Sequence, residues 1–127
     1  MKKWLFLSSL ILLLLSSCES ETDVTYYVEN RSSQTVNLSG RDLIHSSDVS
    51  ETIASSETVA FMNWSKLGKD ATIFEPADVF SDLRIVNEGG DTANTNFQDL
   101  NQWEVNVEES RFMAIHQYTW VITDADF

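Results

Sequence analysis

The chain has 127 residues, of which 43% are hydrophobic and 22% charged, and its 8 Lys and Arg against 20 Asp and Glu give a net charge of −12. This length and composition fit one small domain and are too apolar for a disordered chain. Phosphate binding needs clustered Lys and Arg, so the acidic balance argues against nucleic acid as a partner. It also argues against adsorption to an anionic membrane through protein charge.

Residues 1–17 have the composition of a cleaved signal peptide. Met1-Lys2-Lys3 is basic, and residues 4–17 are uncharged and dominated by Leu, Ile and Phe. These are the basic and apolar regions of an export signal. A transmembrane helix, the alternative, needs about 20 apolar residues, and this run is shorter. The pattern therefore predicts export and removal of residues 1–17.

Leu15-Ser16-Ser17-Cys18, at the end of the apolar run, resembles the bacterial lipobox. The resemblance implies that the Cys18 thiol receives a diacylglyceryl group, that the signal is cut just before Cys18, and that the new amine is acylated. Cys18 is the only cysteine, so it cannot form an internal disulfide. Two or more acyl chains anchor a protein stably, so we expect the membrane as a partner through this lipid anchor. The alternative is a signal peptide that happens to end near a cysteine.

Glu19, Glu21 and Asp23 follow the cysteine and alternate with Ser and Thr. Such a polar run is typical of a solvated tether, so we assign residues 18–23 to the lipidated cysteine and an acidic tether. The tract is also similar to acidic sorting tracts that direct lipoproteins of some Gram-negative bacteria to the outer face of the outer membrane. That resemblance implies a surface-exposed outer-membrane lipoprotein, and the alternative is a lipoprotein that faces the periplasm.

Residues 24–127 form the predicted domain, because short β-rich runs alternate there with clusters of Ser, Asn, Asp and Gly. The first strand begins at Val24, and Val24, Tyr26 and Val28 share one of its faces. The return at residues 35–38 predicts a hairpin with this strand.

The middle of the chain gives weaker strand signals. Gly40 predicts a break, after which residues 43–56 only suggest strands. Residues 57–64 are apolar on both faces, which predicts a strand covered on both sides. Residues 71–74 are expected to form a short strand, and residues 77–80 one helical turn.

The last third contains a strand at residues 83–87, the longest loop at residues 88–99, a strictly alternating strand at residues 103–107, and closing strands at residues 111–115 and 118–123. Aliphatic neighbours two positions away place Trp103 and Trp120 in the core. About seven or eight short strands in this length predict an all-β, immunoglobulin-like antiparallel β-sandwich, although the Cys…Trp…Cys pattern of true immunoglobulin domains is absent.

The residues Tyr26-Tyr27-Val28-Glu29-Asn30, Trp103, and the run from Tyr118 to Asp124 resemble small β-sandwich lipoproteins of Gram-negative bacteria. That group has no established activity. The resemblance therefore implies a fold and a location only.

No set of residues with catalytic or metal-binding spacing occurs in the sequence. No serine lies in a Gly-x-Ser-x-Gly elbow. The two histidines, His45 and His116, have no zinc spacing with other ligands, and we interpret them as a solvated and a strand histidine. We expect no catalytic residues, no metal, no cofactor and no enzymatic activity.

The loop at residues 88–99 carries two weaker motifs. Asp91-Thr92-Ala93 resembles the Asp-(Ser/Thr)-aliphatic signal for O-glycosylation in some Gram-negative bacteria, which makes Thr92 a candidate acceptor. The oxygen-rich residues of the loop could also hold calcium, but their order does not match the EF-hand.

Tyr27 and Trp64 lie opposite residues that we assign to the core, so they are the candidates for an exposed aromatic patch. We expect a non-enzymatic binding or accessory module that meets a protein or glycan partner at the cell envelope. The alternative is a small envelope enzyme or enzyme inhibitor. An exposed aromatic patch would favour the first function, and a deep cleft that holds a histidine beside a carboxylate would favour the second.

Overall fold

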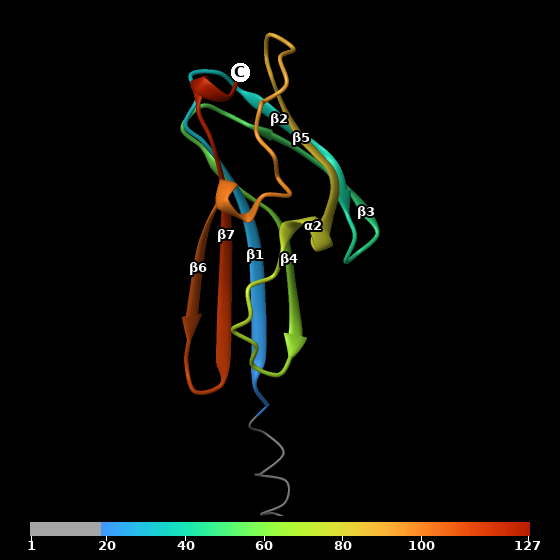
Figure 1. The fold of residues 1–127 in the computed structure, drawn as a ribbon, viewed down its shortest axis with the longest axis vertical. Coiled ribbons are helices and arrows are strands. Elements are labelled where there is room, and N and C mark those ends of the chain that lie inside the picture. Colours follow the sequence, from blue (N-terminus) through green and yellow to red (C-terminus); the bar gives the residue numbers. More distant parts are fainter. Residues whose placement is uncertain (1–18) are drawn as a thin grey trace, which may run out of the picture.

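The computed structural model describes residues 19–127, which form seven strands and three short helical segments (Figure 1). The strands are β1 (Glu21–Asn30), β2 (Val36–Asp42), β3 (Ser47–Ile53), β4 (Thr58–Leu67), β5 (Phe80–Asn87), β6 (Trp103–Glu109) and β7 (Met113–Ile122). The helical segments are α2 (Pro76–Val79) and two 3-10 turns, η1 (Leu100–Gln102) and η2 (Asp124–Asp126). The helical turn predicted near residue 77 is confirmed by α2.

The strands form two packed sheets, with the orders β4-β1-β7-β6 and β3-β2-β5. The predicted all-β sandwich is therefore confirmed. The pairings are antiparallel except that of β1 with β7, which is parallel. The expectation of a wholly antiparallel sandwich is wrong for this central pair. Parallel neighbours need a long connection, and nearly the whole domain lies between its first and last strands.

The strand order also differs from that of an immunoglobulin domain. In the immunoglobulin fold the first and second strands lie in the same sheet as the fourth and fifth. Here the first strand lies between the fourth and the last, and the second strand belongs to the other sheet. The immunoglobulin-like arrangement, which we expected from domain size and strand number, is not confirmed.

The two sheets pack face to face in what we call the distal half, where β2, β3 and β5 cover the upper parts of β1 and β7 (Figure 1). Val28 and Ile122 are fully buried there. They belong to the same apolar cluster as Leu38 and Ile85 of the opposite sheet. The face predicted from the alternation of β1 is confirmed, and burial of apolar surface is the main stabilising contribution in this half.

Aromatic rings fill the centre of the sandwich around Tyr26. The Tyr26 ring stacks on Tyr118 at 4.9 Å between centroids and meets the edge of Trp103 at 5.9 Å. Trp103 in turn stacks on Trp120 at 5.5 Å. The predicted core positions of Trp103 and Trp120 are confirmed, because 5% and 1% of these residues are exposed.

β4 pairs with β1 through a β-bulge in which Phe61 is the extra residue. The bulge moves the alternation by one position, so Val59 before it and Met62 and Trp64 after it all pack on the core. This shift explains why residues 57–64 are apolar on both predicted faces. The expectation of a strand covered on both sides is wrong, because the outward side chains of β4, such as Ala60 and Asn63, are exposed.

β2 continues through Gly40, where the sequence predicted a break. The register between β2 and β5 shifts at this point. A Cβ atom on Gly40 would lie 2.7 Å from Leu83 Cδ2 and 2.9 Å from Leu83 Cα. The two strands therefore approach too closely for a side chain, and glycine permits the bulge.

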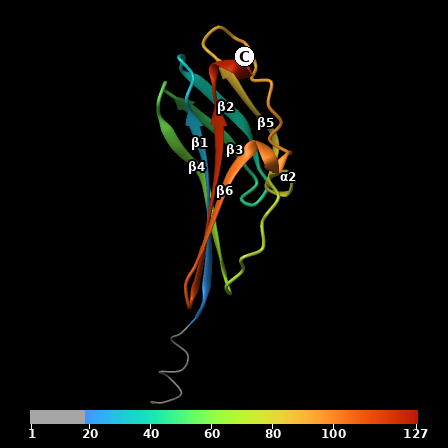
Figure 2. The same cartoon turned by 60° about the vertical axis from the view of Figure 1, so that its left-hand side comes forward.

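Residues 68–75 take the place of the second sheet in what we call the proximal half, the lower part of the four-stranded sheet (Figure 2). This segment forms no strand, contrary to the expectation for residues 71–74. The Phe74 ring covers Trp64 and His116, with centroid distances of 5.0 Å and 4.9 Å. Its backbone N–H donates to the Tyr118 hydroxyl over 2.7 Å.

Buried polar groups also hold residues 68–75 against the sheet. Thr22 is fully buried, and its hydroxyl donates to the Gly68 carbonyl over 2.6 Å and accepts from the Asp70 N–H over 2.8 Å. The His116 ring Nε2 lies 2.6 Å from the Asp70 carbonyl oxygen and donates to it. These hydrogen bonds, together with the packing of Phe74, therefore hold the irregular segment on the sheet in the proximal half.

The long loop of residues 88–99 folds back onto the two core tryptophans. The Trp103 indole N–H donates to the Phe97 carbonyl over 2.9 Å, and the Trp120 indole N–H donates to the Thr95 hydroxyl over 3.1 Å. Each buried indole thus has a partner supplied by the loop, which acts as part of the core cover.

Candidate binding cleft

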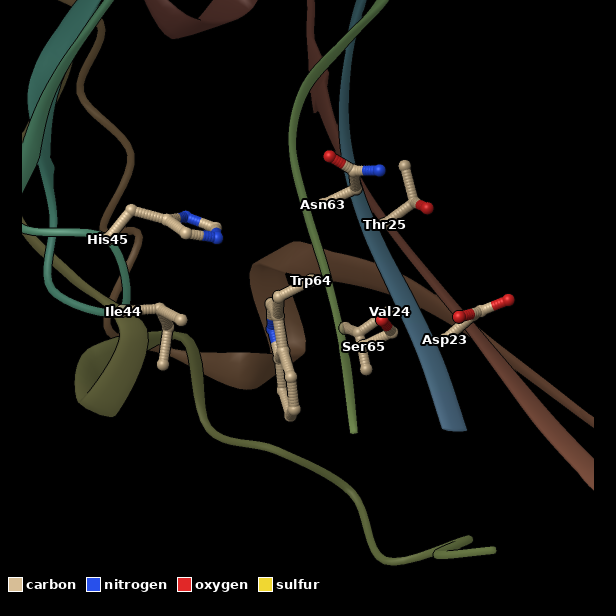
Figure 3. Close-up of a pocket in the computed structure, with 8 residues that line it drawn as sticks. All are labelled: Asp23, Val24, Thr25, Ile44, His45, Asn63, Trp64 and Ser65. Carbon is tan, nitrogen blue, oxygen red and sulfur yellow. The ribbon is translucent and has the colours of Figure 1, made fainter. Parts of the chain in front are cut away.

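A cleft of about 510 Å³ lies between the edge strand β4 and the turn that joins β2 to β3 (Figure 3). Its volume is in the range of small-ligand sites. Its lining comes from β1 (Asp23, Val24, Thr25), from the turn (Ile44, His45) and from β4 (Asn63, Trp64, Ser65). In Figure 3, Ile44 and His45 face Trp64 across the cleft, whereas Asp23 and Thr25 lie beyond β4.

Trp64 forms one wall of the cleft. The bulge at Phe61 turns its indole to the inner face of the sheet, where it packs edge-on against Phe74. Trp64 is partly exposed, but its ring Nε1 is buried and has no hydrogen-bond partner within residues 19–127. A buried donor without a partner costs about 1–3 kcal/mol, so an acceptor that reached this nitrogen would be favoured.

Tyr26 lies behind this wall. Its side chain is fully buried, and its hydroxyl also has no hydrogen-bond partner in the described part of the chain. Burial raises the pKa of the Tyr26 phenol far above its usual range, and Tyr118 and Asp42 raise this pKa further. The Trp64 indole lies near enough to lower this pKa slightly, yet the two groups do not meet hydrogen-bond geometry.

His45 stands at the opposite wall, and Asp42 holds it from behind. Asp42 is 3% exposed, and its carboxylate accepts the backbone N–H groups of Ile44 and His45 over 2.8 Å and 3.0 Å. The other carboxylate oxygen lies 2.5 Å from His45 Nδ1, and half of the His45 side chain is exposed. Sequence reasoning had treated His45 as solvated and had not selected Asp42. The Asp-x-x-His spacing in a turn was the signal available for this pair.

The structure does not bring Tyr27 and Trp64 together into one patch. Trp64 pairs with Val24 and shares its inner face, whereas Tyr27 alternates with Tyr26 and lies on the outer face. Each of the two is only partly exposed. Trp64 therefore belongs to the cleft, and Tyr27 belongs to a separate surface.

The acidic tract is partly built into the fold. β1 begins at Glu21, so Glu21 and Asp23 lie in a strand and only Glu19 precedes it. The first strand, predicted to begin at Val24, begins three residues earlier, and Thr22 is buried between the two acids. The outward side chains of Glu21 and Asp23 remain on the outer face. Cys18, the predicted lipidation site, lies outside the described residues.

The candidate acceptor Thr92 is exposed and forms an isolated bridge with Val86. The hydroxyl is therefore reachable from solvent, although the backbone is held. Within residues 19–127, including the loop of residues 88–99, no group of three or more His, Cys, Asp or Glu side chains is placed to hold a metal ion.

His116 is fully buried under Phe74, and its Nδ1 has no partner among the described residues. It lies far from solvent and forms part of the proximal core, as the interpretation of a strand histidine predicted. In the part of the chain that the structure describes, no helix has the length and apolar character needed to cross a membrane.

Comparison of the chain with known protein families, with curated proteins and with solved structures finds no match. The geometry of the cleft is therefore the basis for any functional conclusion.

Proposed function

We propose that this protein is a lipid-anchored cell-envelope protein that acts as a non-enzymatic binding module, with its ligand in the cleft beside Trp64. The observation that carries the proposal is the cleft wall, where the partly exposed indole of Trp64 faces Ile44 and His45 across the cleft. Ligand sites combine apolar walls with a few polar groups in this way.

The chemistry of the cleft favours a glycan over the other envelope ligands. An indole offers a flat apolar face for the C–H groups of a sugar ring, and the His45 ring across the cleft offers hydrogen bonds to its hydroxyls. The excess of Asp and Glu over Lys and Arg in the chain disfavours phosphorylated or acidic ligands by repulsion. A protein segment that presents hydroxyl or amide groups is the second ligand that this surface fits.

The test measures binding of neutral oligosaccharides to the mature protein in detergent. Tryptophan fluorescence and equilibrium dialysis monitor the binding. We expect His45→Ala to weaken binding about fivefold to tenfold, the loss of one hydrogen bond. Tyr27→Ala is the matched control on the opposite face of the sheet and should leave binding unchanged. The absence of binding to any oligosaccharide, or equal affinities in all variants, would contradict the glycan proposal.

The lipobox supports attachment of the protein to the outer membrane through Cys18. Cys18→Ser should leave the precursor uncut and abolish palmitate labelling. Labelling that persists in this variant would contradict the anchor.

The acidic residues Glu19, Glu21 and Asp23 support display on the cell surface over the periplasmic face. Replacing all three with Ala should protect the protein from protease added to intact cells, while lipidation persists. Equal digestion of variant and wild type would show that the acidic tract is only a spacer and not a sorting signal. Resistance of both to the protease would show that the protein faces the periplasm.

The Asp42–His45 pair favours a second candidate function, a small enzyme or enzyme inhibitor, because a carboxylate that orients a histidine supplies two of the three members of a hydrolytic triad. No Ser, Thr or Cys side chain within residues 19–127 hydrogen-bonds to the His45 ring. A panel of ester, peptide and glycoside substrates tests it. Turnover that His45→Ala abolishes would replace the binding proposal with this one.

A further inference from the structure

Three segments meet at the end of the sandwich where the described chain begins. We call this end the N-terminal tip and define it as residues 19–22, 66–70 and 108–113. It lies at the bottom of Figure 1, where β1 starts, β4 ends and the β6–β7 turn closes.

Hydrogen bonds tie the segments together. The Glu21 N–H donates to the Phe112 carbonyl and the Gly68 N–H to the Ser20 carbonyl, each over 2.8 Å. The tip is therefore an ordered surface that begins within three residues of Cys18.

Two large apolar side chains are exposed on this surface. Leu67 is 76% exposed, the highest value among the large hydrophobic residues described, and Phe112 is 41% exposed. They flank Glu21, because Leu67 pairs with it in the sheet and the Phe112 carbonyl accepts its N–H. The Arg111 guanidinium lies 5.1 Å from the Phe112 ring centroid. An aromatic ring with an adjacent arginine suits an interface that is apolar on one side and polar on the other.

The length of the intervening chain limits how far this surface can be from a lipid anchor. Three residues separate Glu21 from Cys18, and a fully extended chain of that length spans at most about 11 Å. The headgroup layer on each side of a bilayer is several ångströms thick. An acylated Cys18 would therefore keep Leu67 and Phe112 within reach of the lipid headgroups.

The charge of the tip is compatible with this contact. The tip carries three cations (Lys66, Lys69 and Arg111) and five acids, a net charge of −2. Two of the tip acids are paired, Asp70 with Lys66 at 2.6 Å and Glu109 with Lys69 at 3.7 Å. Repulsion between the tip and a negative membrane surface is therefore small.

We propose that the N-terminal tip is a membrane-contacting surface in which Leu67 and Phe112 enter the headgroup layer and hold the domain upright. This inference rests on the proposed lipid anchor at Cys18. The cleft then lies close to the membrane, since Asp23 and Thr25 are two and four residues along β1 from Glu21, or about 7–13 Å. The loop that carries Thr92 lies at the opposite end, farthest from the lipid (Figure 1).

The experiment uses the acylated protein in vesicles of phosphatidylethanolamine and phosphatidylglycerol. Leu67→Cys and Phe112→Cys each introduce one free thiol, because the only native cysteine is Cys18 and its thiol is acylated. A polarity-sensitive fluorophore on that thiol is quenched either by nitroxide lipids or by aqueous iodide. Thr92→Cys is the matched control at the far end. All three sites are exposed, so the variants should fold.

We expect lipid quenching at positions 67 and 112 to exceed that at position 92 several-fold, with the opposite order for iodide. Equal exposure of all three labels to iodide in vesicle-bound protein would contradict the proposed membrane contact of the tip but not the proposed lipid anchor at Cys18. Labels that are shielded from iodide yet not quenched by lipid would show that a second copy or another protein covers the tip, which also overturns the proposal. Protein that does not float with the vesicles has no anchor, and both proposals then fail.

Discussion

The distal and proximal halves of the sandwich bury different kinds of side chain against the same four-stranded sheet. In the distal half a second sheet supplies apolar partners such as Leu38 and Ile85, each 1% exposed. In the proximal half an irregular segment covers Thr22 and His116, two fully buried polar residues that bond to its backbone. A sheet that faces another sheet needs only shape and apolarity, whereas a sheet that faces irregular backbone must satisfy the free N–H and C=O groups of that backbone.

The difference predicts that truncating apolar side chains will damage the distal half and the centre, and that removing single polar atoms will damage the proximal half. The cleft and the N-terminal tip both lie in the proximal half. Loosening this half should therefore affect ligand binding before it affects the fold as a whole.

Trp103→Ala should give the largest loss of stability. Trp103 is 5% exposed, stacks on Trp120 and donates its indole N–H to the Phe97 carbonyl. Truncation of a buried aromatic ring costs about 3–5 kcal/mol, measured as the free energy of unfolding in urea. Tyr27→Ala on the outer face is the control and should cost about 1 kcal/mol or less. Similar values for the two variants would contradict the central position of Trp103.

Thr22→Val tests the proximal half with an almost isosteric change. The variant leaves the Gly68 carbonyl and the Asp70 N–H without their buried partner, at a cost of about 1–3 kcal/mol. Because the lost bonds hold only residues 68–75, amide hydrogen exchange should accelerate in this segment and remain slow in β2 and β5. Uniform acceleration across both halves would show that they unfold as one unit.

Tyr118→Phe and Tyr26→Phe form a matched pair at the boundary between the halves. The Tyr118 hydroxyl accepts the Phe74 N–H, so its removal leaves a donor unpaired and should cost about 1–2 kcal/mol. The Tyr26 hydroxyl has no partner in the described structure, so its removal should be neutral or slightly stabilising. Thermal melts of the two variants measure the difference. A larger loss for Tyr26→Phe would reveal a hydrogen bond at that hydroxyl.

Mild acid should loosen the proximal half by the smallest effect of the four. The hydrogen bond from Lys66, with further ones from Thr72, holds the pKa of Asp70 far below its ordinary value of 3.8. Because the folded pKa is depressed, the stabilisation is present above pH 3.8 and is lost as the pH falls through the folded value. The protection factors of residues 68–75 in hydrogen exchange, taken relative to the intrinsic rate at each pH, should fall below pH 3.8. Asp70→Asn should remove this dependence; an unchanged pH profile would exclude Asp70 as its source.

The sequence by itself determined which residues share a face of each strand, because side-chain alternation is a property of the local backbone. Val24, Tyr26 and Val28 are buried as the alternation predicted, and so are Trp103 and Trp120. The turn chemistry of Ser, Asn, Asp and Gly likewise marked most strand ends. The same reasoning predicted a two-layer β-sandwich, since strands of this length bury their apolar faces only against another layer.

Only the tertiary structure decided which strands are neighbours and what the candidate site contains. Alternation assigns a face to each residue but no partner strand, so the parallel pair of β1 and β7 left no local signal. The bulge at Phe61 aimed Trp64 inward, away from the surface shared by Tyr27. The cleft joins residues 23–25, 44–45 and 63–65, which only the packing of three distant segments brings together. Contacts between residues far apart in sequence depend on the whole chain, and no local pattern encodes them.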